Sequence, residues 1–405
     1  MKKLISALAA VVALGASGQA HAAGFQLDVV TARGTGMAGS MTAAVDDASA
    51  SFYNPAGLAR GQYYDLEAGA AFLIPNFTFT PASGGPSTST DSEVVPPPGL
   101  FAAWGATDEL ALGIGEFTNY GNKLSWPDTF SGRFLIRSIS LQNFTLNPTA
   151  AFKIGDRVRV GIGVQIVRSV AELNQDINFV DSVGSVDLGA DTWGAGGNMG
   201  LQVDILPRLL TFGAAYRSPV DLNFNNGKAH FSNVPVEFAN TLKDQPGNLE
   251  LQMPQTLQLG ISSRPIEPLL IDIDVQYTGW QTMNAVVLNF EDPQLSKTEP
   301  KNWTHTWNYR IGAEYRLNPS ITLRAGLLID PTPSPNDTVG PDLPDASRVN
   351  IALGGRYTYH DLKIDLGYQL VLFSSVTTTN PVLPGDYKGL ANVIALTVSY
   401  GNAPK

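Results

Sequence analysis

The 405-residue sequence has no cysteine and only four histidines. Without cysteine, a disulfide-stapled secreted fold, thiol chemistry and cysteine-based zinc sites are excluded. The histidines beyond the first 22 residues, His230, His305 and His360, are not spaced with a second histidine or a carboxylate as a metal site requires. We therefore expect neither a metal nor another cofactor.

The sequence is also short of positive charge, and it lacks the motif of a serine hydrolase. Its formal net charge is −10, and no basic stripe is available to neutralise a phosphate backbone, which argues against nucleic-acid binding. No Gly-x-Ser-x-Gly sequence is present, so nothing indicates a nucleophile elbow. We expect a protein that is not an enzyme.

A long hydrophobic run is missing after the first 22 residues, so no transmembrane helix is expected there. One apolar run, Leu4–Ala16, follows the basic Met1–Lys3 and precedes Ala20-His21-Ala22, a small-x-small cleavage sequence. The run is too short to span about 30 Å of hydrocarbon, and this layout is typical of a secretory signal peptide. We predict a signal peptide at residues 1–22 and a mature chain that begins at Ala23.

What the sequence does have is a period-two alternation of apolar and polar residues. Residues 348–359, for example, place Val349, Ile351 and Leu353 on one face and Asn350 on the other. A strand with one apolar and one polar face needs lipid or a core on one side and water on the other. The mean hydropathy near zero fits a transmembrane barrel, because lipid-facing and lumen-facing residues cancel.

About fourteen such segments lie between residues 62 and 400, an even number, as expected of a closed bacterial barrel. We place the third at 109–117 and the seventh at 208–224. Short turns such as Asn318-Pro319 alternate with long loops such as 331–346. The sequence therefore predicts an all-β protein. Its fold would be a transmembrane antiparallel up-and-down β-barrel in the outer membrane of a Gram-negative bacterium, with residues 401–405 as a C-terminal extension.

Residues 23–61 do not show this alternation. They are rich in small residues and end in Asn54-Pro55-Ala56-Gly57-Leu58. A barrel of this strand number has a lumen, and such lumens are often plugged, so one interpretation is an N-terminal plug. A disordered leader that ends in a turn at Asn54-Pro55 fits the residues equally well. The residues alone leave both interpretations open.

Several short motifs follow one another along nearly the whole mature chain, and none is specific by itself. The main motifs are Ala23-Gly24-Phe25-Gln26-Leu27, Ala32-Arg33-Gly34, Asp46-Asp47-Ala48-Ser49, Asn54-Pro55-Ala56-Gly57-Leu58, Gly213-Ala214-Ala215-Tyr216-Arg217-Ser218, Met253-Pro254-Gln255, Tyr277-Thr278-Gly279-Trp280, and Trp303 with Thr306-Trp307. Together and in this order they resemble the FadL/TodX family of outer-membrane transporters of hydrophobic compounds.

The resemblance implies fourteen strands and an N-terminal hatch, residues 23–61, folded inside a barrel of residues 62–400. The hatch would carry its motif at Asn54, Pro55 and Ala56. Outer loops would catch a hydrophobic ligand and pass it to an internal apolar pocket. Hatch movement would then release it sideways through a gap where the third strand kinks inward. We place that kink near residues 110–117, where two glycines could permit a bend, Gly113 and Gly115.

Two further groups of residues are candidates for contact with ligand. Four loop aromatics could catch it, although they could equally pack the loop onto the barrel rim: Tyr120, Trp126, Phe130 and Phe134. A carboxylate ligand would need an inward cation, and five arginines alternate inward. In any barrel the lumen is polar, so these arginines prove little by themselves: Arg159, Arg310, Arg316, Arg324 and Arg356.

The sequence thus predicts passive uptake of small hydrophobic ligands, either long-chain fatty acids or aromatic hydrocarbons. No nucleotide-binding motif indicates an energy source other than the concentration gradient. Expected partners are outer-membrane lipids, lipopolysaccharide and the barrel-assembly machinery, which would meet the aromatic Tyr400 at the end of the last strand. We expect a monomer. The alternatives are a water-filled diffusion porin and a surface adhesin or structural barrel whose long loops do the work.

Overall fold

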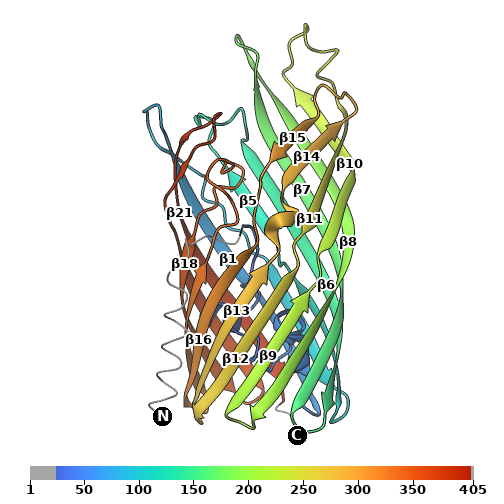
Figure 1. Cartoon of the computed structure of the whole chain (residues 1–405), viewed down its shortest axis with the longest axis vertical. Helices are drawn as coiled ribbons and strands as arrows, with labels where there is room; N and C mark the ends of the chain where they lie inside the picture. Colours follow the sequence, from blue (N-terminus) through green and yellow to red (C-terminus); the bar gives the residue numbers. More distant parts are fainter. Residues whose placement is uncertain (1–23, 403–405) are drawn as a thin grey trace.

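A computed structural model describes residues 24–402, so the predicted signal peptide and the last part of the predicted C-terminal extension lie outside the described residues. Fourteen antiparallel strands close into a tall barrel (Figure 1). Each strand pairs with its neighbours in the wall, and the first and last strands pair from Asp65 with Gly401 to Pro81 with Gly385. The predicted fold class is confirmed. The described helices are too short and insufficiently apolar for any of them to cross a bilayer.

The wall strands run in chain order around the barrel. They are β1 (Tyr63–Pro81), β3 (Pro98–Gly105), β4 (Leu110–Phe117), β6 (Ser138–Ile154), β7 (Val158–Asn178), β8 (Val183–Leu206), β9 (Leu210–Arg217), β12 (Thr256–Ile266), β13 (Leu269–Thr278), β16 (Thr306–Asn318), β17 (Ile321–Asp330), β18 (Arg348–Tyr359), β19 (Leu362–Phe373) and β21 (Gly385–Gly401).

Seven further strands extend or decorate this wall. They are β2 (Thr88–Ser89), β5 (Gly121–Ser125), β10 (Val220–Ser232), β11 (Gln245–Met253), β14 (Ala285–Phe290), β15 (Lys297–Pro300) and β20 (Val376–Thr378). The short helices are α2 (Ala32–Gly36), α3 (Ala50–Tyr53), η1 (Pro55–Leu58) and η2 (Trp280–Thr282).

Side chains along each strand alternate between lipid and lumen. On β21, Ile394, Leu396 and Val398 point outward and are 41–45% exposed, whereas Val393 and Ala395 point inward and are buried. Apolar side chains on the outer face suit contact with lipid, since neighbouring wall strands hydrogen-bond each other's backbone. The apolar and polar residues that alternate in the sequence therefore correspond to the outward and inward side chains of the wall.

The predicted seventh strand, 208–224, is divided in two. β9 ends at Arg217, and β10 begins at Val220 and pairs with β11 and the upper part of β8. The interruption falls at Ser218-Pro219, because proline has no N–H to donate to a sheet. Above this level β10 and β11 rise with β7 and β8 to the far end of the molecule (Figure 1).

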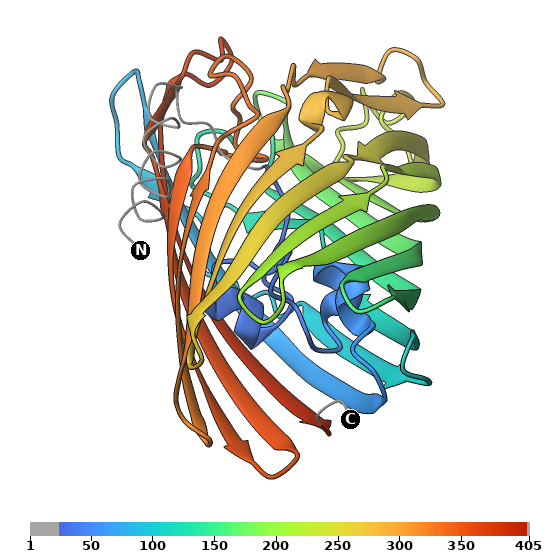
Figure 2. The same ribbon diagram turned by 60° about the horizontal axis from the view of Figure 1, so that its bottom comes forward.

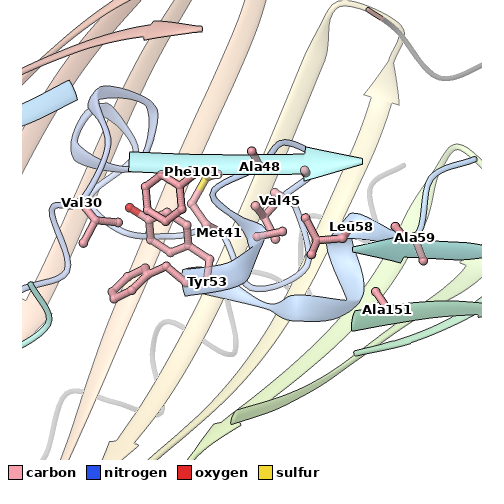
Figure 3. Close-up of a cluster of buried hydrophobic side chains, with 14 of the residues drawn as sticks. Val30, Met41, Val45, Ala48, Tyr53, Leu58, Ala59, Phe101 and Ala151 are labelled. Carbon is pink, nitrogen blue, oxygen red and sulfur yellow. The ribbon is translucent and has the colours of Figure 1, made fainter. Parts of the chain in front are cut away.

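Residues 24–61 lie inside the barrel, where α2, α3 and η1 are enclosed by the strands (Figure 2). Nearly every residue of this segment is buried. The apolar side chains of Met41, Val45, Tyr53 and Leu58 pack together and against Phe101 of β3 (Figure 3). The segment is therefore folded, and its apolar core includes side chains of the wall.

Glycines on the lumen side of the wall make room for this segment. A Cβ at Gly200 of β8 would overlap the Asn54 side chain, and one at Gly161 of β7 would overlap the backbone of Pro55. The Asn54 amide donates to the carbonyls of Thr42 (2.7 Å) and Leu201 (3.1 Å), which ties the segment to β8. Small residues here permit backbone-to-backbone contact that larger side chains would prevent.

A valine at position 200 should displace the segment. We expect Gly200→Val to leave the barrel folded but to raise its ion conductance in planar bilayers several-fold over the wild-type protein. The valine side chain would occupy the space that Asn54 and Pro55 fill in the wild-type protein. The matched control is Gly197→Val on the same strand, where a Cβ meets little beyond a carbonyl at 3.5 Å. Equal conductance of the two variants would contradict this account.

Candidate functional site

An apolar cavity of about 350 Å³ lies between the buried N-terminal segment, the wall and two outer loops. This volume lies within the usual range of small-molecule pockets. The apolar side chains that line it come from distant parts of the chain: Leu27, Leu73, Phe77, Val95, Leu141, Leu328, Val371, Phe373 and Val393. A compartment lined in this way can accept the apolar part of a ligand and offers few polar contacts to water.

The start of the described chain forms one side of this cavity. It is hydrogen-bonded to residues 119–121, which connect β4, the third wall strand, to β5. The Leu27 N–H donates to the Asn119 carbonyl (2.9 Å), and the Gly121 N–H donates to the Phe25 carbonyl (3.0 Å). Gln26 and Tyr120 face each other in this short antiparallel bridge. The N-terminal segment therefore completes backbone pairing that the barrel wall itself leaves open.

A break in the pairing of the wall lies just beyond Gly113 and Gly115, the residues of the predicted kink. β4 is regularly paired on both sides through Gly113 and Gly115, and the strand breaks only after Phe117. It resumes as β5, which pairs with β6 alone. The neighbouring β3 does not extend to meet β5, because it begins at Pro98 directly after Pro96-Pro97, and proline has no N–H to donate. The interruption in strand pairing falls at Thr118–Tyr120, and the kink at Gly113 and Gly115 stays a prediction.

The cavity reaches the outer face of the barrel at this break. Its lining includes Phe144 of β6, which is 39% exposed on the lipid side, and Pro96 to Pro98 on the other edge. Thr118 and Gly121 line it from the interrupted strand. The lining of the cavity thus includes residues on both edges of the break in the wall.

The predicted capture aromatics lie elsewhere than in the cavity lining. Trp126 and Phe130 are buried and stacked at 4.1 Å on the rim, and Trp126 Nε1 donates to the Pro341 carbonyl (2.9 Å). Phe134 is half-buried under the Arg133 guanidinium. For Trp126 and Phe130 the structure agrees with the alternative reading, in which they pack the loop onto the rim.

Tyr120 belongs to a second aromatic group at the strand break. Its ring lies 6.0 Å from Phe25 and 6.0 Å from Trp280, and Trp280 also contacts Trp303 at 5.2 Å. The Tyr120 hydroxyl donates to the Pro254 carbonyl (3.0 Å). These rings fix Phe25, and with it the start of the N-terminal segment, against the wall.

The five arginines predicted to face the lumen all carry carboxylate partners, and none of them lines the cavity. Arg316 is exposed, with its partner Glu267 at 2.8 Å. The others pair as Arg159 with Asp204, Arg310 with Asp28, Arg324 with Glu314 and Asp365, and Arg356 with Asp365.

Two cations that line the cavity were missed in the sequence, Lys123 and Arg348. Lys123 of β5 is paired with Glu93 at 2.7 Å. Arg348 starts β18 and is paired with Asp330 at 2.8 Å. The signal that could have found it is its inward position at the end of the long 331–347 loop.

Arg33 of α2 holds the N-terminal segment through a buried ionic network. Its guanidinium contacts Asp46 (2.5 Å), Asp47 (2.7 Å) and Glu314 of β16 (3.2 Å). Burial alone would raise the pKa of Asp47, but the Arg33 charge outweighs it and lowers that pKa below its usual value. The network therefore stays ionised at neutral pH and joins the segment to the wall.

A buried carboxyl, Asp345, borders the cavity from the outer loop. It accepts from the Thr332 hydroxyl (2.5 Å) and from the Gly24 N–H, and Arg348 lies nearby. Burial raises the pKa of Asp345 to about 6, although these neighbours pull it down. The folded protein therefore binds a proton at Asp345 between about pH 4 and 6 that the unfolded chain has released.

Because the folded-state pKa of Asp345 is raised, folding stability should fall as pH rises through this window and level off above it. Asp345→Asn removes the cost of a buried charge. We expect this variant to have a higher thermal unfolding midpoint than wild type at pH 8, with a gain in the free energy of unfolding of at most about 3 kcal/mol. At pH 4 the two proteins should have the same midpoint. Asp337→Asn, an exposed position in the same loop, should change neither value. A gain at pH 4 equal to that at pH 8 would contradict the assignment.

Comparison with known proteins gives consistent results over nearly the whole chain. The family model "Outer membrane protein transport protein (OMPP1/FadL/TodX)" matches residues 13–401. Outer membrane protein P1 of Haemophilus influenzae is 27% identical, covering 96% of this chain and 95% of that protein. The long-chain fatty acid transport protein of Escherichia coli O6:H1 is 25% identical, covering 89% of each.

Solved structures share the fold. A Pseudomonas aeruginosa FadL homologue superposes with a TM-score of 0.82 at 20% identity, covering 93% of this chain and 99% of that one. The Pseudomonas putida toluene transporter TodX gives a TM-score of 0.74 at 19% identity, with the same coverage. The family match, the barrel and the outer-membrane relatives agree: this chain belongs to the OMPP1/FadL/TodX family, whose members are outer-membrane transporters of hydrophobic compounds and not enzymes.

Proposed function

We propose that this protein carries long-chain fatty acids or aromatic hydrocarbons through the outer membrane without an energy source, by way of the apolar cavity and the break in the third wall segment. The observation that carries this proposal is the cavity lining, which is apolar inside and includes the exposed Phe144 on the lipid side. Relatives named for fatty acid and toluene transport support the ligand class.

Lateral exit fits the energetics of an apolar cargo. Each CH₂ group gains about 0.8 kcal/mol on leaving water, so release into the aqueous periplasm would be opposed for a long alkyl chain. Passage from the cavity past Pro96–Pro98 and Phe144 keeps the cargo in apolar surroundings. The barrel carries it through the polar lipopolysaccharide layer, which blocks direct entry.

The N-terminal segment would act as the hatch in this route. Its residues Phe25–Leu27 occupy the backbone positions at the strand break, so they must separate from Asn119–Gly121 before a ligand can pass. The motif of Asn54, Pro55 and Ala56 would anchor the rest of the hatch: Asn54 caps η1 by accepting from the Ala56 N–H (3.2 Å) and donates to β8. Movement would then be confined to the start of the hatch.

The remaining partners follow from the barrel. Its outward leucines, isoleucines and valines would contact membrane lipid, and its tall outer strands would stand among lipopolysaccharide. The last strand, with Tyr400 pointing outward, would engage the assembly machinery. We propose that the protein works as a monomer, since its cavity is built from a single chain.

Uptake of labelled oleate and toluene by cells that lack their own transporters tests the proposal. We expect the wild-type protein to raise uptake of at least one of them clearly above empty-vector cells. Val393→Trp fills the cavity with an indole ring and should lower that uptake by on the order of tenfold. Ile394→Trp, the lipid-facing neighbour on the same strand, should leave it unchanged. Wild-type uptake no faster than that of empty cells would overturn the proposed function.

A further inference from the structure

Arg217, the last residue of β9, points into a narrow space behind the strand break. Its side chain is nine-tenths buried, with 9% exposed. The space is also lined by Asn119, Tyr120, Gln165 and Met253 and is too narrow for a water molecule. The proposed transport route does not account for this arginine.

The guanidinium of Arg217 is held by neutral groups alone. Its Nη1 donates to Gln165 Oε1 (2.6 Å), and its Nη2 donates to the Phe52 carbonyl (2.9 Å). The Phe52 and Phe117 ring centroids lie 5.4 and 5.3 Å from its central carbon. Rings and carbonyls stabilise a cation only in part.

Within residues 24–402, no carboxylate lies within ion-pair distance of Arg217. The other fully buried arginines differ: Arg33, Arg310 and Arg324 each contact one or more carboxylates at 3.2 Å or less. A buried charge without a counter-ion is costly. Arg217 therefore presents an uncompensated positive charge in a site that an anion would stabilise.

The site adjoins the transport route. Asn119 and Tyr120 of the interrupted segment line the space around Arg217, whereas the flanking Thr118 and Gly121 line the large apolar cavity. One short stretch of backbone thus separates the two. It is the same stretch that Phe25–Leu27 hold in place, so its release would join the cavity to the arginine.

Building on the proposed function, we propose that Arg217 receives the carboxylate of an anionic amphiphile whose tail occupies the apolar route. The carboxylate would replace Gln165 Oε1 and the Phe52 carbonyl as acceptor, because two opposite charges in a buried site attract each other more strongly than a cation attracts a neutral carbonyl. Arg217 would then make the transporter prefer fatty acids over neutral compounds of equal length.

Oleate and oleyl alcohol test this, since they share a tail and differ in charge. Arg217→Gln should lower oleate uptake by on the order of tenfold and leave oleyl alcohol uptake unchanged, and Arg217→Lys should restore part of the oleate uptake. The control is Arg168→Gln on β7, an exposed arginine, which should alter neither. Gln165→Glu keeps the arginine but places a fixed negative charge beside it. This variant should also lower oleate uptake and leave oleyl alcohol uptake unchanged.

Other outcomes would overturn the inference. Equal loss of both compounds in Arg217→Gln, with oleate uptake unaffected in Gln165→Glu, would make Arg217 a structural clamp on the hatch. Unchanged oleate uptake in both variants would remove Arg217 from the route. If cells carrying the wild-type protein took up none of oleate, oleyl alcohol and toluene, the proposed function itself would fail, and this inference with it. Migration of the unheated protein on a gel would show that each variant barrel is folded.

Discussion

Every backbone N–H and carbonyl inside a bilayer must find its partner within the protein, and the rest of this structure follows from that constraint. It forces the wall to close on itself from β1 to β21. Where the wall cannot pair, as after Phe117 in β4, another segment has to supply the partners. Residues 25–27 do so. Their hydrogen bonds satisfy backbone groups of residues 119–121 and also cover the break in the wall pairing.

Burial of charge obeys a similar rule in the lumen. Arg33, Arg310 and Arg324 are deeply buried, yet each is matched by carboxylates from a different part of the chain. Removing one partner from such a set is costly because the other is left uncompensated. Arg217 differs from these three, since among residues 24–402 no carboxylate lies within ion-pair distance of it.

The sequence predicted well what depends on local pattern and less well what depends on distant contacts. Alternation and turn residues are local, so the barrel and its strand number could be read directly. The division of 208–224 at Ser218-Pro219 was also visible in principle, since proline cannot donate to a sheet. Gly113 and Gly115 lie in regularly paired backbone, since a glycine permits a bend without requiring one. Here Gly113 lies against Leu58 and Ser51 of the N-terminal segment, which explains its small size.

The cavity and its charges could not be predicted in this way. Their residues come from the chain start, the wall and the 331–347 loop, and nothing in the sequence reports that they meet. Inward alternation identified arginines but not their partners, so it could not separate the neutralised ones from Arg217. Partner geometry, and not residue type, decides which charge is available.

The seam between β1 and β21 also has a consequence for how the molecule forms. It joins strands from opposite ends of the mature chain, so the final pairing has a very high contact order and is expected to be slow. Until it forms, two long strands expose unpaired edges that can template aggregation. Pairing of β1 with β21 therefore does more than complete the ring: it also ends the period in which these edges can pair with another chain.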